Sequence, residues 1–102
     1  MRQVTSVQEF NNILSGNKYV FVDFYADWCG PCKMMTPVVE ALERENGHIV
    51  FVKVNVDSAQ ELTRNYGISA MPTFMCFIDG VKKEEIMGAN VGEVKRIISL
   101  MK

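Results

Sequence analysis

The stretch from residue 19 to residue 45 places two cysteines between an apolar run and an amphipathic helical pattern. The run at 19–25 reads YVFVDFY, and Asp23 is the only charged residue in it. Such a run predicts a strand that is buried on both faces, as in the middle of a parallel sheet. Cys29 and Cys32 then occupy the turn that leads into the helix. This order puts a sulfur atom at a helix N-terminus, just beyond the carboxyl end of a strand.

Each residue of the turn has a chemical reason to be there. The reactive form of cysteine is the thiolate, and a helix N-terminus favours an anion, so we expect Cys29 to have a lowered pKa. Pro31 suits a first helical turn because it has no N–H to leave unpaired, and Gly30 is expected to let the backbone turn closely without a Cβ in the way. Cys32 follows Cys29 by one helical turn, so the two sulfurs can bond. A disulfide over so short a loop restricts the unfolded chain little, and it is better suited to being made and broken than to holding a fold.

The rest of the chain predicts strands and helices in the order βαβαβαββα. Strands are expected at 2–5, 19–25, 49–56, 73–78 and 82–87, and helices after Ser6, after Cys32, over 59–66 and after Asn90. Ser6 is expected to form a capping box with Glu9, and Asp79-Gly80 is a hairpin signal. Strands that are separated by helices should be parallel, whereas the final hairpin must be antiparallel. The prediction is an α/β fold, a five-stranded mixed sheet with helices on both faces, in which the cysteines lie beyond the carboxyl end of a central strand.

Composition places the chain among small globular proteins. Its 102 residues suffice for a single domain over 1–102, and 48% of them are apolar. The net charge of −1, with both signs interspersed, gives no indication of nucleic-acid or membrane-surface binding. We expect no signal peptide and no membrane span, because the N-terminus lacks an apolar core and no apolar run is long enough. Three cysteines do not make a secreted disulfide framework, so a reducing compartment, the cytoplasm, is expected.

The cysteine pair could instead be structural, or it could be half of a zinc site. Zinc needs four ligands, and only His48 and Cys76 remain to supply the others. Cys76 lies within a buried strand pattern, where we expect it to act as a small hydrophobic residue, and His48 is expected to be solvated. This shortage of ligands favours the redox interpretation, and neither a metal nor another cofactor is expected.

The motif WCGPCK at 28–33, with Val22-Asp23-Phe24 before it and Met71-Pro72-Thr73 after it, resembles the thioredoxin family. The similarity covers nearly all of the chain. It implies the thioredoxin fold, in which the five-stranded sheet is flanked by four helices. It also implies a protein-disulfide reductant whose Cys29 attacks a substrate disulfide and whose Cys32, expected to be the more buried of the two, resolves the mixed disulfide.

The resemblance also bears on Asp23, Lys53 and Pro72. From the residues alone, Asp23 is either a buried acid with a raised pKa or an acid that turns outward or is satisfied by hydrogen bonds. Thioredoxins have a buried Asp at this position, which implies a proton acceptor for Cys32. Lys53 matches a Lys that pairs with this Asp in some members, and an ordinary strand-edge charge is its alternative. Most X–Pro bonds are trans, but the family has a cis proline at the position of Pro72, packed against the disulfide.

The resemblance implies a substrate groove formed by Trp28, Met71, Gly88 and Ala89. The backbone of Met71 would pair with an extended substrate segment as an added strand. The ring of Trp28, partly exposed beside the sulfurs, would give an apolar contact surface, and a core position is its alternative. Gly88 and Ala89 match the small residues that line the far side of the family's groove.

The resemblance implies partners as well as chemistry. Because the chain has no cofactor-binding motif, its oxidised form would be regenerated by a thioredoxin reductase, an NADPH-dependent flavoprotein. Substrates would be disulfide-containing proteins such as peroxiredoxin-type enzymes, and the chain is expected to be a monomer. Two rivals stay open. One is a disulfide oxidase or isomerase of the same fold, against which Pro31 argues because oxidase-type relatives typically have histidine there. The other is a binding module in which redox chemistry is incidental.

Overall fold

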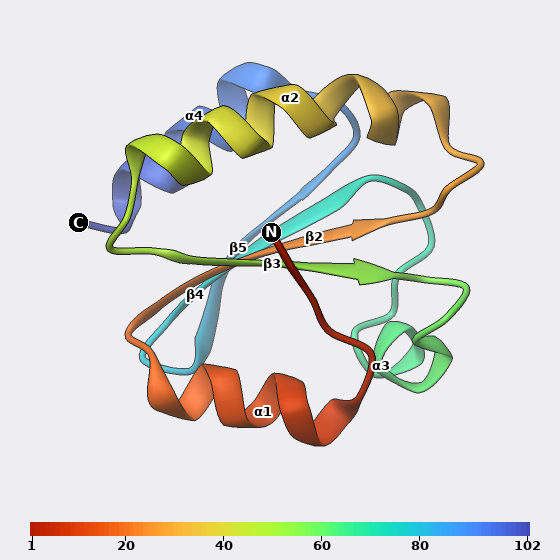
Figure 1. Cartoon of the computed structure of the whole chain (residues 1–102), viewed down its shortest axis with the longest axis horizontal. Helices are drawn as coiled ribbons and strands as arrows, with labels where there is room; N and C mark the ends of the chain where they lie inside the picture. Colours follow the sequence, from red (N-terminus) through yellow and green to blue (C-terminus); the bar gives the residue numbers. More distant parts are fainter.

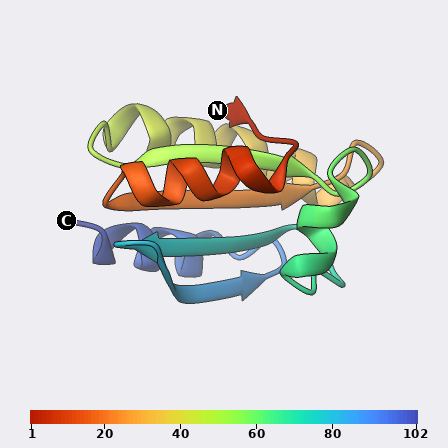
Figure 2. The same cartoon turned by 90° about the horizontal axis from the view of Figure 1, so that it is seen from below.

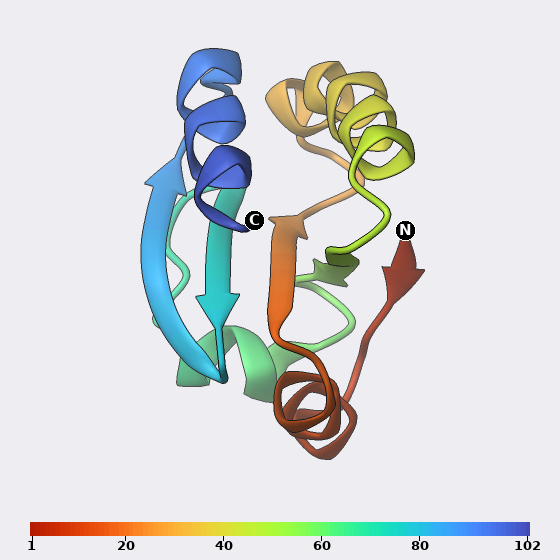
Figure 3. The same cartoon turned by 90° about the vertical axis from the view of Figure 1, so that its left-hand side faces the viewer.

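The central strand of the sheet is β2 (Tyr19–Tyr25), in which every residue from Val20 to Phe24 is buried. The computed structural model describes residues 1–102. The strands form one five-stranded mixed sheet in the order β1 (Arg2–Gln3), β3 (Val50–Asn55), β2, β4 (Thr73–Ile78) and β5 (Val81–Met87), and Figure 3 shows them side by side. The apolar side chains of β2 alternate between two buried faces, which confirms the prediction for residues 19–25.

Helices cover both faces of the sheet, so each face has its own hydrophobic core (Figure 1). The helices α2 (Gly30–Glu45) and α4 (Val91–Leu100) pack on one face. The helix α1 (Val7–Gly16) packs on the other face, together with the short α3 (Gln60–Asn65). No helix is long and apolar enough to cross a membrane.

Alternation along β2 decides where Asp23 points. Phe21 packs in the core beneath α2 and α4, whereas Val22 packs in the core with α1. Asp23 is two residues after Phe21, so it faces α2, the helix that carries the cysteines. In the sheet register Asp23 lies between Lys53 of β3 and Phe74 of β4.

Strand β4 contradicts the prediction that strands separated by helices are parallel. Strand β3 is parallel to β2, but β4 is antiparallel to it. The reason is α3, whose six residues extend only about 9 Å and so do not carry the chain back along the strands. Figure 2 shows α3 at the ends of the strands, so the chain enters β4 from the end of the sheet at which it leaves β3. Strand β5 is antiparallel to β4, as the hairpin signal predicts, and Asp79 and Gly80 in the turn have φ values of 53° and 80°.

The helix caps follow the prediction, with one difference in detail. Ser6 Oγ accepts the backbone N–H of Glu9 at 3.1 Å, and Asn90 caps α4 in the same way. The capping box at Ser6 is incomplete, because the Glu9 carboxylate binds Arg2 at 2.9 Å instead of reaching back to Ser6. Strand β1 has two residues, so it is shorter than the expected 2–5.

Candidate redox site

The redox pair is a disulfide between Cys29 and Cys32 at the N-terminus of α2. The two Cα atoms are 5.3 Å apart, and Cys29 is the residue that caps the helix. Cys29 Sγ accepts the backbone N–H of Cys32 at 3.2 Å, and the Cys29 carbonyl accepts the N–H of Lys33 at 3.2 Å. The predicted placement of a sulfur at a helix N-terminus is confirmed. The positive end of the helix dipole therefore lies where a Cys29 thiolate would form.

Two details of the turn differ from the prediction. Cys32 is not the more buried cysteine, because both are 5% exposed and pack in one small apolar cluster with Ala26. The expected steric reason for Gly30 is wrong, since an added Cβ would meet no atom within 4 Å. Pro31 does occupy the first turn of α2, as predicted.

Asp23 is a buried carboxyl group that lacks a full set of hydrogen-bond partners. Only 5% of Asp23 is exposed, and its Oδ1 forms no hydrogen bond. Burial raises the pKa of Asp23 to about 7, while the Lys53 ammonium lowers it in part. The outward-facing alternative is therefore wrong. The carboxyl can gain or lose a proton near neutral pH.

A cavity of about 60 Å³ links Asp23 with α2. Thr36 and Glu40 of α2 line it together with Asp23 and Lys53. Thr36 is one turn beyond Cys32, and its Oγ1 donates to the Cys32 carbonyl at 3.2 Å. The cavity thus places Asp23 beneath the middle of α2. Lys53 is the direct neighbour of Asp23 in the pairing of β2 with β3, and its ammonium lowers the pKa of that carboxyl.

The loop before β4 lies beside the disulfide. The Met71–Pro72 peptide bond is cis, as the resemblance implies. Met71 packs against the apolar cluster that holds the disulfide, and its N–H and C=O form no backbone hydrogen bond. The Pro72 carbonyl accepts the N–H of Gly88 at 2.8 Å, which brings the end of β5 to the same loop. Ala89 follows Gly88 and is exposed.

Trp28 is exposed and is held by polar contacts that sequence reasoning missed. Trp28 is 67% exposed, so the alternative of a position in the core is wrong. Trp28 Nε1 donates to Asp57 Oδ2 at 2.9 Å. The backbone N–H of Asp57 donates to Asn55 Oδ1 at 2.9 Å, and Asn55 Nδ2 donates to Asp27 Oδ2 at 3.4 Å. In the sequence, the only indication of these contacts is a pair of polar residues, Asn55 and Asp57, at the carboxyl end of the strand that pairs with β2.

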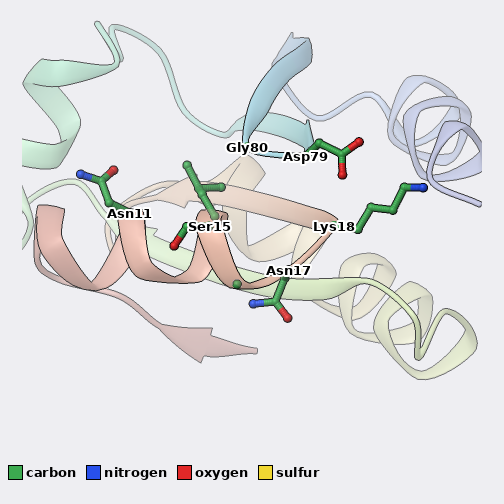
Figure 4. Close-up of a pocket in the computed structure, with 8 residues that line it drawn as sticks. Asn11, Ser15, Asn17, Lys18, Asp79 and Gly80 are labelled. Carbon is green, nitrogen blue, oxygen red and sulfur yellow. The ribbon is translucent and has the colours of Figure 1, made fainter.

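The largest surface hollow lies at the other end of the sheet. It measures about 620 Å³ and is lined mainly by polar residues (Figure 4). Asp79 and Gly80, between β4 and β5, line it together with Asn17 and Lys18, which precede β2. Cys29 follows the opposite end of β2. The hollow is therefore separate from the redox site.

The two other candidate zinc ligands do not join the cysteine pair. Cys76 is fully buried in β4, and burial raises the pKa of its thiol, in keeping with the expected core position. His48 is exposed, as expected, and its Nε2 lies 2.7 Å from the Met101 carbonyl oxygen. No group of three or more His, Cys, Asp or Glu residues could hold a metal ion. Cys29 and Cys32 are bonded to each other rather than gathered in a larger ligand set.

Fold and site together define a class of protein. Two cysteines form a disulfide across one turn at the start of a helix, where a thiolate is stabilised. A buried acid that titrates near neutral pH lies on the strand that faces this helix. These are the parts that thiol–disulfide exchange requires, so the site defines a thiol–disulfide oxidoreductase.

Comparisons with known proteins place the chain within this class. The family model described as Thioredoxin matches residues 2–102. Thioredoxin 1 of Plasmodium falciparum is 42% identical over 95 residues, which cover 93% of this chain and 91% of the relative. A solved structure of Plasmodium falciparum thioredoxin has a TM-score of 0.95 at 39% identity and covers 100% of both chains. A second solved chain comes from work on the thiol-resolving mechanism of yeast mitochondrial 1-Cys peroxiredoxin via glutathione/thioredoxin systems. It has a TM-score of 0.94 at 35% identity, and the match covers 97% of this chain and 93% of that one. The chain belongs to the thioredoxin family.

Proposed function

We propose that this thiol–disulfide oxidoreductase is a general protein-disulfide reductant, with Cys29 as nucleophile and Cys32 as resolving thiol. The observation that carries the proposal is the Cys29–Cys32 disulfide at the N-terminus of α2. Residues one helical turn apart bring their sulfurs together within a single element, so the pair can be made and broken without rebuilding the fold. Pro31 between the cysteines supports the reducing direction, because oxidase-type relatives typically have histidine there.

In the first step, the Cys29 thiolate attacks one sulfur of a substrate disulfide. A bond forms between Cys29 Sγ and that sulfur, the substrate S–S bond breaks, and the second substrate sulfur leaves as a thiolate that takes up a proton. The dipole of α2 and its first N–H groups stabilise the Cys29 thiolate before the attack. The product is a mixed disulfide between Cys29 and the substrate.

In the second step, Cys32 loses its proton to Asp23 and attacks Cys29 Sγ. The Cys29–Cys32 bond forms, the mixed disulfide breaks, and the substrate leaves with both of its sulfurs reduced. The two electrons that the substrate gains come from the Cys29–Cys32 dithiol. Asp23 suits this task because its pKa of about 7 lets it accept and release a proton near neutral pH. Lys53 assists by keeping that pKa from rising further.

The substrate is proposed to bind as an extended segment beside the Met71–Pro72 loop. The unpaired backbone N–H and C=O of Met71 would hydrogen-bond with this segment, as in strand addition to a sheet edge. Trp28 would give an apolar contact surface on the same side as the sulfurs. Gly88 and Ala89 would leave room for the segment on the far side.

The reaction also needs a source of electrons and a place to act. We propose that a thioredoxin reductase, an NADPH-dependent flavoprotein, regenerates the dithiol, because this is the electron donor that membership of the thioredoxin family implies. Peroxiredoxin-type enzymes are proposed substrates, which the yeast peroxiredoxin work on a similar chain supports. We further propose that the chain works as a monomer in the cytoplasm. Sedimentation equilibrium and cell fractionation would test these two points.

A coupled assay tests the proposed function. The chain is mixed with a thioredoxin reductase, NADPH and insulin, a protein with accessible disulfides, and NADPH consumption is followed. The unmodified chain should sustain turnover, and Cys29→Ser should abolish it. Cys32→Ser should also stop turnover, but it should accumulate a mixed disulfide through Cys29 that mass spectrometry detects. Cys76→Ala is the matched control and should keep full turnover, because Cys76 is buried in the core.

Two results would contradict the proposal. One is turnover that survives Cys29→Ser, which would mean that another group reduces the substrate. The other is full biological activity in cells of a variant that carries both Cys29→Ser and Cys32→Ser. That result would favour the binding-module alternative.

A further inference from the structure

We propose that Asn55 is a positioning residue that holds the ring of Trp28 in place for substrate docking. The Asn55 side chain connects the two loops that follow β2 and β3 at the end of the sheet where the disulfide lies. This inference rests on the proposed docking role of Trp28. It adds to that role a residue that touches neither the sulfurs nor the substrate.

Asn55 is buried at the end of a central strand and uses both ends of its amide group. It is the last residue of β3, it pairs with Tyr25 of β2, and it is 8% exposed. Its Oδ1 accepts the backbone N–H of Asp57 at 2.9 Å, and its Nδ2 donates to Asp27 Oδ2 at 3.4 Å. A buried amide is costly unless it is hydrogen-bonded, so these contacts hold the two loops to the strand as well as to each other.

The ring of Trp28 depends on this arrangement. Trp28 is 67% exposed, so little of its ring is fixed by packing against the core. Its polar contact is the bond from Nε1 to Asp57 Oδ2, at 2.9 Å. Asp57 is itself exposed and lies in a loop, and Asn55 fixes its backbone. Asn55 also binds Asp27, the residue before Trp28, so it acts on both the backbone and the indole of Trp28.

A fixed ring favours docking without taking part in the chemistry. A side chain that is already ordered loses less freedom when a partner binds, so binding is tighter. When the ring is released, the substrate must order it, and the KM for a protein disulfide rises. The sulfurs and Asp23 are unchanged, so kcat should stay the same.

The test combines fluorescence with kinetics on the full chain. Trp28 is the only tryptophan, so fluorescence anisotropy of the reduced protein reports its motion directly. In Asn55→Ala the anisotropy should fall, and the KM for insulin in the coupled assay should rise roughly fivefold, which corresponds to about 1 kcal/mol. The kcat should remain within a factor of about two.

A second variant keeps the test valid if Asn55→Ala fails to fold, and two control variants accompany it. Asp57→Ala changes an exposed residue and removes the indole acceptor directly, so it should lower the anisotropy and raise KM as Asn55→Ala does. Asp57→Asn keeps an acceptor oxygen and should restore values near those of the unmodified chain. Asn46→Ala removes a side-chain bond to the Leu42 carbonyl, 2.8 Å long, at the far end of α2, and should change neither quantity.

Three results would overturn the inference. They are an unchanged anisotropy in both Asn55→Ala and Asp57→Ala, an unchanged KM despite a lower anisotropy, and a fall in kcat with KM unchanged. The last result would mean that Asn55 supports the structure of the site rather than the placement of the ring. Failure of the proposed function would look different, because the unmodified chain itself would then not reduce insulin, whereas the anisotropy would still report whether Asn55 holds Trp28.

Discussion

Replacing Asp23 with asparagine should stabilise the fold at neutral and basic pH but not in acid. Burial raises the pKa of Asp23 from 3.8 to about 7 in the folded chain. The folded state therefore favours the neutral carboxyl. Its contribution to stability is fully present below about pH 4, is lost as pH rises towards 7, and stays lost above that. This difference in pKa corresponds to roughly 4 kcal/mol of unfolding free energy.

Urea unfolding from pH 4 to pH 8 measures this effect. The oxidised protein is used, because the disulfide cysteines then do not titrate. The free energy of unfolding of Asp23→Asn, minus that of the unmodified chain, should rise with pH and level off above pH 7, by up to about 4 kcal/mol. The buried amide of asparagine adds an offset that does not depend on pH, so the change with pH is the diagnostic quantity. The same variant should slow the reduction of protein disulfides, because Cys32 loses its proton acceptor.

Asp79→Asn is a suitable control. Asp79 is exposed in the turn between β4 and β5, and asparagine tolerates its positive φ of 53°. Asp79→Asn removes the same formal charge as Asp23→Asn, but it should give a difference in stability that hardly changes between pH 4 and pH 8. The raised pKa of Asp23 would be disproved by a flat profile for Asp23→Asn. It would also be disproved if that variant, relative to the unmodified chain, were less stable at pH 8 than at pH 4.

Three further predictions concern the surroundings of the site and the core. Lys53→Met should raise the pKa of Asp23 further, because the ammonium lowers it; carbon-13 NMR titration of the carboxyl measures this, and Lys83→Met, an exposed change on β5, should leave the titration unaltered. Cys76→Ser should lower the free energy of unfolding by about 1–3 kcal/mol in urea, because it buries a hydroxyl where the sulfur packs at 0% exposure, yet turnover of insulin should persist. Phe10→Ala should cost about 3–5 kcal/mol in the same assay, because the ring is fully buried and packs edge-on against Tyr66 and Phe77; a loss below about 1 kcal/mol would contradict this core assignment.

Local patterns account for what could be predicted about the fold. The apolar run of β2 and the caps at Ser6 and Asn90 depend on residues close together in sequence, and the structure confirms them. The direction of β4 depends instead on where α3 lies in three dimensions, at the ends of the strands, so that the chain does not cross back before β4. Alternation of helices and strands does not contain that information, so the parallel prediction was wrong.

In the site, too, some features follow from the local sequence and others do not. The position of Cys29 at a helix N-terminus follows from the turn and the helical pattern after it. The cis bond before Pro72 runs against general preferences and was expected only from the resemblance. The contacts of Asn55 join loops that follow two different strands, so they become visible only when the strands are paired. Cys29 and Cys32 are equally buried in one apolar cluster with Ala26, a packing arrangement that the spacing of the two cysteines does not reveal.

The reduction potential of the Cys29–Cys32 pair is the sharpest test of the proposed reductant. The chain is equilibrated with mixtures of reduced and oxidised glutathione, and the fraction of disulfide is read by mass spectrometry after the thiols are blocked. Cys76→Ala serves as the background, so that only the pair is titrated. We expect a potential well below that of the glutathione couple, at which the dithiol gives up its electrons readily. A potential well above that couple would mean that the dithiol is the stabilised state, and it would contradict the reductant proposal in favour of an oxidase.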